Sequence, residues 1–301
     1  MRVAVTGADG FVGRWLTREL TAAGHEVIGS SGRRPDVTDA AALRAWLDEA
    51  PPAAVIHLAA ISSGPVAAAD PALAFAVNVG GTINLIEAAR HVAPAPVVLV
   101  PSSGEVYGRP DPGDLPLRET SPIRPRGTYA LTKAAQEAII RAAGERHGLP
   151  VVVARAFNHT GPGQRASFVV PAIAARIRAV AAGDAATIPI GNLDVARDFL
   201  DVRDVVRAYR LLVEGACSGA VAPGSVVNVA SGRSTTIRSI VEALCEAAGV
   251  DAPVVVDPAL VRPDEVPDVR GDASLLASMV DWRPEIPFDR TLGEVLAALD
   301  A

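Results

Sequence analysis

The stretch "RVAVTGADGFVG", residues 2–13, decides the fold. A short apolar run is followed by Gly7, Gly10 and Gly13, and a helical pattern then extends over about residues 11–23. Glycines allow a tight turn and let the backbone approach a pyrophosphate closely, while the start of a helix offers unpaired N–H groups and a partial positive charge. This order of strand, glycine turn and helix predicts a loop that binds the phosphates of a dinucleotide. A plain strand-to-helix turn is the alternative.

The first half of the chain repeats this alternation of apolar strand and amphipathic helix. Strands that are apolar throughout, with helices between them, indicate a parallel sheet covered on both faces. The predicted fold class is therefore α/β, with a Rossmann-type doubly wound parallel sheet. The strands are expected at residues 2–6, 26–30, 53–59, 96–101 and 150–157, and the helices at residues 11–23, 39–49, 72–92 and 127–147.

The second half of the chain has a different rhythm, with loops rich in glycine and proline. It predicts a smaller C-terminal substrate-binding lobe over the carboxyl edge of the sheet. We expect a dinucleotide-binding domain over residues 1–160 and mainly a nucleotide-sugar-binding lobe over residues 161–301, with a soft boundary that lets the chain cross back. The helices of this half are expected near residues 168–182, 203–214, 235–248 and 290–299.

Composition narrows the classes of function. The formal net charge of −6 disfavours a nucleic acid or an anionic membrane as the main partner, because both are bound through broad basic surfaces. No run approaches the roughly 18 uninterrupted apolar residues of a membrane helix. Two distant cysteines and five histidines without ligand spacing predict neither a disulfide framework nor a metal site. We therefore expect a cytoplasmic, unprocessed chain.

The end of the second predicted strand bears on the choice of dinucleotide. Folds that prefer NAD usually carry an acidic residue there, whereas this chain has Ser30, Ser31, Arg33 and Arg34. Hydroxyls and guanidinium groups suit a 2′-phosphate, so NADP(H) is the preferred cofactor, with NAD(H) and an exposed polar turn as the alternatives. Asp36, which follows, can accept a hydrogen bond from the adenine amino group.

A tyrosine and a lysine stand four residues apart in the "TYALTK" stretch, Thr128 to Lys133. Lys133 is the only lysine in the chain, and the helical spacing puts it on one face with Tyr129. An ammonium near a phenol favours the phenolate, and lysine reaches ribose hydroxyls with a geometry that arginine reproduces badly. The pattern predicts an acid/base tyrosine with a lysine partner, and a solvated structural pair is the weaker alternative.

Hydroxyls after the fourth predicted strand complete this set. The run "VPSSGEVYG" carries Ser102 and Ser103, and a hydroxyl there can hydrogen-bond a substrate oxygen as charge develops on it. Loop serines that satisfy turn amides are the alternative.

These motifs resemble the extended short-chain dehydrogenase/reductases, the NAD-dependent epimerase/dehydratase family that acts on nucleotide sugars. The resemblance covers nearly the whole chain. It rests on T-G-x-x-G-x-x-G at residues 6–13, "HLAA" at 57–60, "NVGGT" at 78–82, the Ser-Ser-x-x-V-Tyr-Gly run at 102–108 and Y-x-x-x-K at 129–133. The resemblance implies that Ser103, Tyr129 and Lys133 are catalytic, with Glu105 a secondary candidate. It further implies cofactor contacts from Phe11, Val12, Leu58, Ala59, Ala60, Asn78, Tyr129 and Lys133.

The runs "SSGEVYG" at residues 102–108, "NHTGPGQ" at 158–164 and "DVRD" at 201–204 are most similar to those of GDP-4-keto-6-deoxy-D-mannose reductases, which form GDP-D-rhamnose. Dehydration is disfavoured because Gly104 precedes Glu105, so the residue that would help the leaving hydroxyl is missing. The expected function is NAD(P)H-dependent reduction of a nucleotide-linked 4-keto-6-deoxy sugar. A nucleotide-sugar 4-epimerase with tightly bound NAD, a reductase of a dTDP- or UDP-linked 4-ketosugar, and a non-catalytic dinucleotide-sensing protein are the alternatives. Ser103, Glu105, Asn158, Arg197 and Arg262 are the expected substrate contacts, and the resemblance implies a homodimer.

Overall fold

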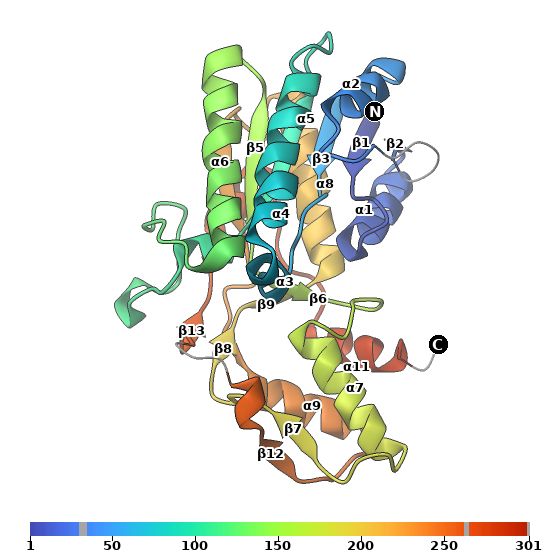
Figure 1. Ribbon diagram of the computed structural model, residues 1–301, viewed down its shortest axis with the longest axis vertical. Helices are drawn as coiled ribbons and strands as arrows, with labels where there is room; N and C mark the ends of the chain where they lie inside the picture. The colour runs from blue at the N-terminus through green and yellow to red at the C-terminus, as the bar shows by residue number, and fades with distance from the viewer. Residues whose placement is uncertain (30–34, 262–264, 300–301) are drawn as a thin grey trace.

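The computed structural model describes residues 1–29, 35–261 and 265–299. Its centre is a six-stranded sheet whose neighbouring strands all run parallel, in the order β10-β5-β4-β3-β1-β2 (Figure 1). The strand order reverses between β1 and β3, which is where doubly wound folds bind their ligands. The Rossmann-type α/β prediction is confirmed. The strands are β1 (Arg2–Thr6), β2 (Glu26–Ile28), β3 (Ala54–His57), β4 (Val97–Ser103), β5 (Val151–Ala156) and β10 (Ser225–Val229).

Helices cover both faces of the sheet, because alternate residues of the buried strands point in opposite directions. Within β4, for example, Val97 and Leu99 face one cluster and Val98 and Val100 face the other. On the first face lie α1 (Phe11–Ala22) and α8 (Val202–Ser218), and on the second lie α2 (Ala40–Glu49), α5 (Gly81–Ala89) and α6 (Gly127–His147).

The helix expected over residues 72–92 is divided into three pieces. A π-helical turn, Ala76–Gly80, joins α4 (Pro71–Phe75) to α5, and a short α3 (Gly64–Ala69) precedes them. The glycine at the junction has a packing reason, since a Cβ on Gly81 would lie 2.7 Å from a methyl group of Val37. The helix therefore approaches the segment after β2 more closely than a larger residue would allow.

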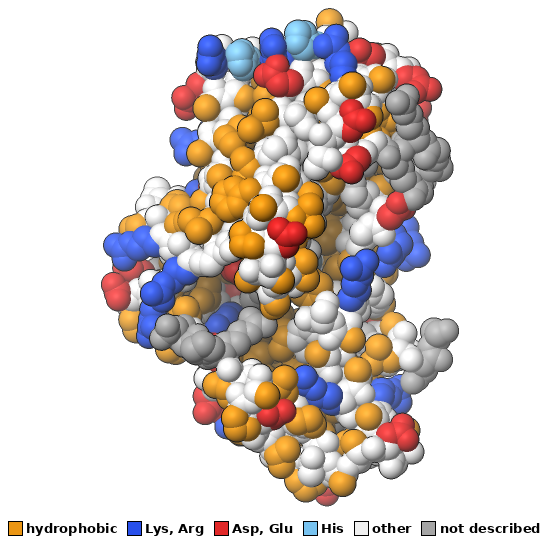
Figure 2. Space-filling model, viewed as in Figure 1, with side chains coloured by type: hydrophobic (Ala, Val, Ile, Leu, Met, Phe, Trp, Pro, Cys, Tyr) orange, Lys and Arg blue, Asp and Glu red, His pale blue; other side chains and the backbone are white. Residues whose placement is uncertain are grey.

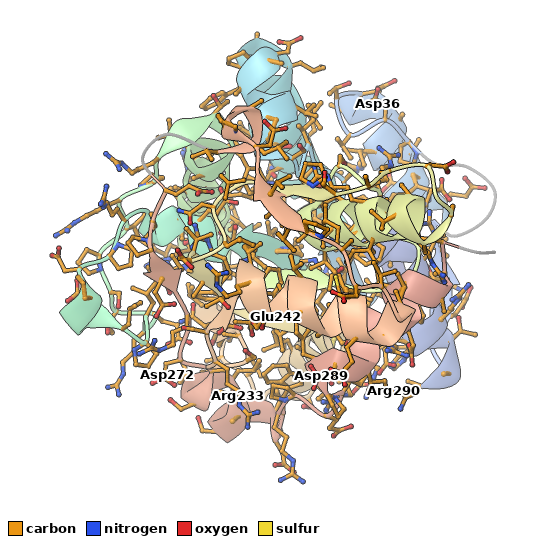
Figure 3. All side chains as sticks on the ribbon, turned by 90° about the horizontal axis from the view of Figure 1, so that it is seen from below. Asp36, Arg233, Glu242, Asp272, Asp289 and Arg290 are labelled. Atoms are coloured by element: carbon orange, nitrogen blue, oxygen red, sulfur yellow. The ribbon has the colours of Figure 1, made fainter. Side chains whose placement is uncertain are left out.

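The smaller lobe has its own apolar core and lies beyond the carboxyl ends of the strands (Figure 1). Seen from this lobe, Asp36 at the edge of the sheet lies well apart from Arg233 and Asp272 (Figure 3). The lobe contains α7 (Val169–Ala181), β7 (Ile188–Ile190), α9 (Ile237–Ala248), β12 (Val254–Val256) and α11 (Phe288–Ala297). Short elements lie between the two parts, namely β6 (Asn158–Thr160), β8 (Ala196–Arg197), β9 (Phe199–Asp201), β11 (Thr235–Thr236) and β13 (Asp268–Val269), whereas α10 (Ser274–Val280) packs against the sheet with α8.

The chain returns to the sheet after the lobe has begun. Helix α8 packs against the sheet, and β10 pairs with β5 from Ser225 opposite Val152 to Val229 opposite Ala156. The sequence analysis did not expect a strand at 225–229. A division of the chain at residue 160 therefore does not separate two independent cores.

Candidate active site

The glycine turn after β1 is shaped by close backbone contacts. Gly7 has a φ of +71°, and a Cβ on it would lie 2.8 Å from the Ala59 backbone nitrogen. A Cβ on Gly13 would lie 2.3 Å from the Gly7 carbonyl oxygen. Gly10 is the N-cap of α1 and provides no side-chain cap. The turn and the start of α1 therefore have the compact backbone that a pyrophosphate needs.

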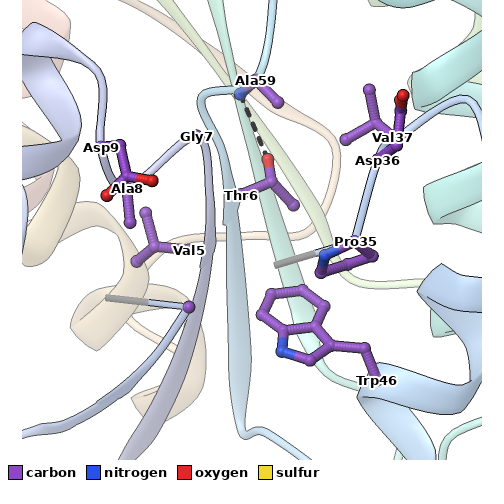
Figure 4. Close-up of a pocket in the computed structure, with 11 residues that line it drawn as sticks. Val5, Thr6, Gly7, Ala8, Asp9, Pro35, Asp36, Val37, Trp46 and Ala59 are labelled. Carbon is purple, nitrogen blue, oxygen red and sulfur yellow. Dashed lines mark hydrogen bonds between the residues drawn. The ribbon is translucent and has the colours of Figure 1, made fainter. Parts of the chain in front are cut away.

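A cavity of about 260 Å³ lies beside this turn. The glycine turn bounds it on one side and Asp36 and Val37 on the other, with the Trp46 ring between them (Figure 4). The Asp36 carboxylate accepts hydrogen bonds from Thr38 N (2.9 Å) and Oγ1 (2.8 Å), which hold its pKa below the usual value. The cavity and the glycine turn together fit the adenosine and diphosphate parts of a dinucleotide. Trp46 was not expected here, and no sequence signal marked it.

Of the residues expected to select the cofactor, Ser30, Arg33 and Arg34 lie outside the described residues. Their part in binding a 2′-phosphate stays a prediction.

The "HLAA" and "NVGGT" motifs meet beside the glycine turn. The Ala59 N–H donates to Thr6 Oγ1 at 3.2 Å, so Leu58, Ala59 and Ala60 follow β3 directly against the end of β1. Asn78 is fully buried, and its side chain both accepts from Ile61 N (2.8 Å) and donates to Ile61 O (3.1 Å). Asn78 therefore anchors the loop after β3.

Ser103, Tyr129 and Lys133 lie together at the carboxyl end of β4 and the start of α6. Lys133 Nζ lies 6.0 Å from the centre of the Tyr129 ring and donates to the Pro101 carbonyl oxygen at 2.9 Å. Burial lowers the pKa of Lys133 to about 8, although the charge of Glu137 acts in the opposite direction. The three residues expected to be catalytic are thus brought into one cluster.

The Lys133 ammonium was expected to favour the phenolate of Tyr129, but this phenol is held in its protonated form in the cluster. Burial raises the pKa of Tyr129 well above its usual value, the negative charge of Glu105 raises it further, and a hydrogen bond with Ser103 lowers it. The Ser103 hydroxyl also accepts from Glu105 N at 3.1 Å. Gly104 between them cannot carry a side chain without displacing Phe157, whose ring atoms would lie 3.0 Å from a Cβ.

His57 lies buried at the end of β3, beneath the same cluster. A hydrogen bond of 2.8 Å joins His57 Nδ1 to Thr6 Oγ1, and His57 Nε2 has no partner among the described residues. Burial, reinforced by the charge of Lys133, lowers the pKa of His57 to about 3. The imidazole is therefore neutral throughout the range in which enzymes usually work.

The expected substrate contacts outside this cluster lie on the elements between the two parts. Asn158 is exposed on β6, and Arg197 on β8 donates from Nη1 to the carbonyl oxygens of Ala196 and Val266, both at 2.7 Å. Arg262 lies outside the described residues.

Two further polar residues beneath the cluster, Glu137 and Arg155, were missed in the sequence. Ser102, which was expected to offer its hydroxyl to the substrate, instead donates to Glu137, and Glu137 also accepts from Arg155. One signal was present, because Glu137 follows Lys133 by four residues, as Lys133 follows Tyr129.

A sequence model described as "NAD dependent epimerase/dehydratase family" matches residues 3–230. The chain belongs to this family. Its resemblance to the family's motifs, inferred from the residues alone, is confirmed.

Two relatives within the epimerase/dehydratase family match nearly the whole chain. GDP-6-deoxy-D-mannose reductase from Pseudomonas aeruginosa is 39% identical over 299 residues, which cover 98% of this chain and 96% of that protein. UDP-glucose 4-epimerase from Mycolicibacterium smegmatis is 32% identical over 307 residues, which cover 95% of this chain and 94% of that protein.

A solved structure shares the fold at similar coverage. The structure of RMD from Pseudomonas aeruginosa complexed with NADPH has a TM-score of 0.90 and 37% identity, and the match covers 99% of this chain and 98% of that one. The chain is thus an enzyme of an NAD(P)-dependent oxidoreductase and epimerase family.

Proposed function

We propose that this enzyme reduces the keto group of a nucleotide-linked 4-keto-6-deoxy sugar, with GDP-4-keto-6-deoxy-D-mannose as substrate and GDP-D-rhamnose as product. The 39% identity to a GDP-6-deoxy-D-mannose reductase along nearly the full chain supports the GDP-linked substrate.

The observation that carries the proposal is the cluster of Ser103, Tyr129 and Lys133, in which Lys133 Nζ lies 6.0 Å from the centre of the Tyr129 ring. A ketoreductase needs a proton donor next to the carbonyl oxygen. Burial keeps the Tyr129 phenol protonated, so this residue can donate that proton. The 39% identity to a GDP-6-deoxy-D-mannose reductase supports reduction over epimerisation.

The cofactor is proposed to lie along the carboxyl ends of β1 and β3. Gly7 and Gly13 would receive the diphosphate, and the cavity beside Asp36 and Trp46 would receive the adenosine. When bound, the reduced nicotinamide supplies the hydride that the carbonyl carbon accepts. We propose NADP(H) as the preferred form, which the NADPH in the structure of the Pseudomonas aeruginosa relative supports.

The protein side chains have separate tasks in this proposal. Tyr129 donates its proton to the oxygen as the carbonyl is reduced, and Ser103 donates a hydrogen bond to the same oxygen. Lys133, fixed by the Pro101 carbonyl oxygen, binds the ribose hydroxyls of the cofactor and stabilises the tyrosinate left behind. Glu105, Asn158, Arg197 and Arg262 are proposed to contact the nucleotide sugar.

A turnover assay tests the type of reaction and the nucleotide base of the substrate separately. Purified enzyme is mixed with NADPH and GDP-4-keto-6-deoxymannose, and loss of NADPH absorbance is followed, with Tyr129→Phe as control. Turnover by the wild type alone supports the proposal. Turnover of a dTDP- or UDP-linked 4-ketosugar in its place would reject the guanine base and keep the reaction. Interconversion of a nucleotide sugar with no added reductant would reject reduction in favour of 4-epimerisation.

We also propose that the enzyme is a cytoplasmic homodimer. Exposed apolar side chains gather over α4, α5 and α6 (Figure 2), among them Leu73 (49% exposed), Ile83 (44%) and Leu131 (46%). Among the described residues, the helical stretch Pro71–Ala89, which includes the π-helical turn, is long and apolar enough to span a membrane by length and composition alone, and 44% of its most apolar window is buried in the structure. A second copy of the chain is the occupant that we propose for this surface.

The proposed cytoplasmic location is supported by the two cysteines, which are both free, as in proteins of a reducing compartment.

A further inference from the structure

The end of β4 and the catalytic face of α6 are joined residue by residue. The carbonyl oxygen of Pro101 accepts from Lys133 Nζ at 2.9 Å, and the next residue, Ser102, donates from Oγ to Glu137 Oε1 at 2.5 Å. Ser103, the residue after that, lies close enough to Tyr129 to lower the pKa of its phenol. Three consecutive residues of the strand thus face three residues of the helix that are spaced four positions apart.

Glu137 is the last of the three helical partners along the chain and is held by a buried arginine. Arg155 Nε lies 3.0 Å from Oε1 of Glu137, and Arg155 Nη2 donates to Oε2 at 2.8 Å. Glu137 is 5% exposed and Arg155 is 4% exposed. Together with the Ser102 hydrogen bond, this fixes both carboxylate oxygens of Glu137.

The second arm of the arginine extends the connection to the loop that follows β4. Arg155 Nη1 donates to the Tyr107 hydroxyl at 3.0 Å, and that hydroxyl donates to Asn228 Oδ1 at 2.7 Å. Tyr107 closes the 3₁₀ turn Gly104–Tyr107, which carries Glu105. The buried network therefore reaches both ends of the segment on which Ser103 and Glu105 stand.

Stability alone does not account for such a network. A buried ion pair loses hydration on both partners, and a well-packed apolar pair of similar volume often does as well or better. Here the pair lies directly under the reactive residues and makes hydrogen bonds to two of the segments that carry them.

We propose that Glu137, clamped by Arg155 and Ser102, is a positioning residue that sets the register of β4 on α6 and thereby holds Ser103 against Tyr129 and the Lys133 ammonium in place. This inference rests on the proposed function of the same site. It adds an electrostatic role for Glu137, whose charge raises the pKa of Lys133 against the opposing effect of burial. Removal of that charge lets Lys133 lose its proton at a lower pH.

The first test replaces Glu137 with an uncharged residue of the same shape. Glu137→Gln is compared with Glu145→Gln, which alters an exposed glutamate on the same helix. We expect Glu137→Gln to lower kcat about 10- to 100-fold and to raise the KM for NADPH much less, because the reacting groups and the Lys133 contact to the ribose are misplaced while the adenosine cavity is untouched. The control should behave as the wild type. Wild-type kcat in Glu137→Gln would overturn the proposal.

A second readout does not depend on the substrate. Lys133 is the only lysine, so its rate of acylation by acetic anhydride can be followed against pH by peptide mass spectrometry, apart from the N-terminal amine. We expect the midpoint to lie near pH 8 in the wild type and lower in Glu137→Gln. An unchanged midpoint would overturn the electrostatic role, even if no ketosugar were turned over and the proposed reaction failed.

If Glu137→Gln folds poorly, two further variants still test the proposal. Ser102→Ala removes the hydrogen bond to the carboxylate and leaves the ion pair, and we expect a severalfold loss of kcat with unchanged cofactor binding. In the double variant Glu137→Met with Arg155→Met, an apolar pair replaces both charges. We expect this double variant to unfold near the wild-type temperature but to lose turnover. If it were fully active, the network would serve only packing, and the positioning role would be rejected.

Discussion

The ammonium of Lys133 lies 6.0 Å from the centre of the Tyr129 ring, one helical turn further along α6. It is 5% exposed and reaches past the strand end to the Pro101 carbonyl oxygen. The space therefore accepts a compact group on a flexible stem, and the planar fork of arginine has a different shape and different donors.

The first prediction follows from this shape. We expect Lys133→Arg to fold and to lose most turnover, by roughly 100-fold or more, because the charge remains but its donors no longer point at the phenol and the ribose. Circular dichroism and thermal unfolding check the fold, and steady-state kinetics check the loss. Near-normal activity would mean that the single lysine is an accident of composition.

The second prediction concerns alkaline pH. Because burial lowers the pKa of Lys133 to about 8, its charge is present below that pH and is lost above it. We expect kcat/KM of the wild type to fall as the pH rises through about 8, since this ratio reports the ionisation of the free enzyme. The measurement is a pH profile of kcat/KM for NADPH at a saturating concentration of the ketosugar. A profile that stays flat well above that pH would contradict the assignment.

The third prediction concerns acid stability. His57 is neutral when folded because its pKa is lowered to about 3, whereas in the unfolded chain its pKa is near the ordinary value of 6.5. Unfolding then binds a proton between these values, so stability falls as the pH falls through this window. We expect His57→Gln to lose less stability than the wild type between neutral pH and about pH 4, by a few kcal/mol. Urea unfolding at several pH values measures it, and equal slopes would contradict it.

The fourth prediction compares two glycines. Gly13→Ala places a Cβ 2.3 Å from the Gly7 carbonyl oxygen, so the cofactor turn must move. We expect a loss of about 1–3 kcal/mol in stability and a clear loss of NADPH affinity. Gly293→Ala, in the interior of α11 with nothing within 4 Å of the new Cβ, should raise stability by up to about 1 kcal/mol. Calorimetry and fluorescence titration separate the two, and normal NADPH binding by Gly13→Ala would count against the turn as the phosphate site.

The fifth prediction tests the proposed dimer. Leu73→Glu places a charge on the apolar surface over α4, and we expect the enzyme to become monomeric. Val256→Glu, on β12 of the smaller lobe, alters an exposed apolar surface that is separate from α4. We expect this variant to keep the molar mass of the wild-type assembly in solution. Light scattering with the wild type as reference decides. A wild-type monomer, or binding of the wild type to lipid vesicles that Leu73→Glu abolishes, would refute a second copy as the occupant.

Apart from the strand–helix alternation that predicts the doubly wound sheet, the features that follow most directly from the sequence are local ones. The glycine turn and the spacing of Tyr129 and Lys133 each lie within a single strand-turn-helix or helix, where geometry follows from position along the chain. The buried set of Ser102, Glu137 and Arg155 joins residues 18 and 35 positions apart, so it depends on how β4, β5 and α6 pack. The four-residue spacing of Tyr129, Lys133 and Glu137 indicates that Glu137 lies on the same helix face, but no pattern in the sequence predicts which strand residue contacts it.

The misses in the fold have similar causes. The strand Ser225–Val229 is only five residues long and is interrupted by the polar Asn228. The residues on either side of it do not continue the strand–helix alternation of the first half, so the sequence pattern does not indicate a strand there. The π-helical turn at Ala76–Gly80 arises from packing, because the Asn78 side chain bonds Ile61 on another segment. Both features are decided by contacts between distant parts of the chain.

The return of the chain to its sheet affects how the protein can be made in a cell. Strand β10 and helix α8, which cover the outer edge of β5 and one face of the sheet, leave the ribosome only after residues 161–201. Until then the emerging first half exposes an open strand edge and an apolar face, both of which invite aggregation. Stable folding of the dinucleotide-binding part must therefore wait for most of the chain to be translated, and a chaperone that shields the nascent β5 edge would protect it during that interval.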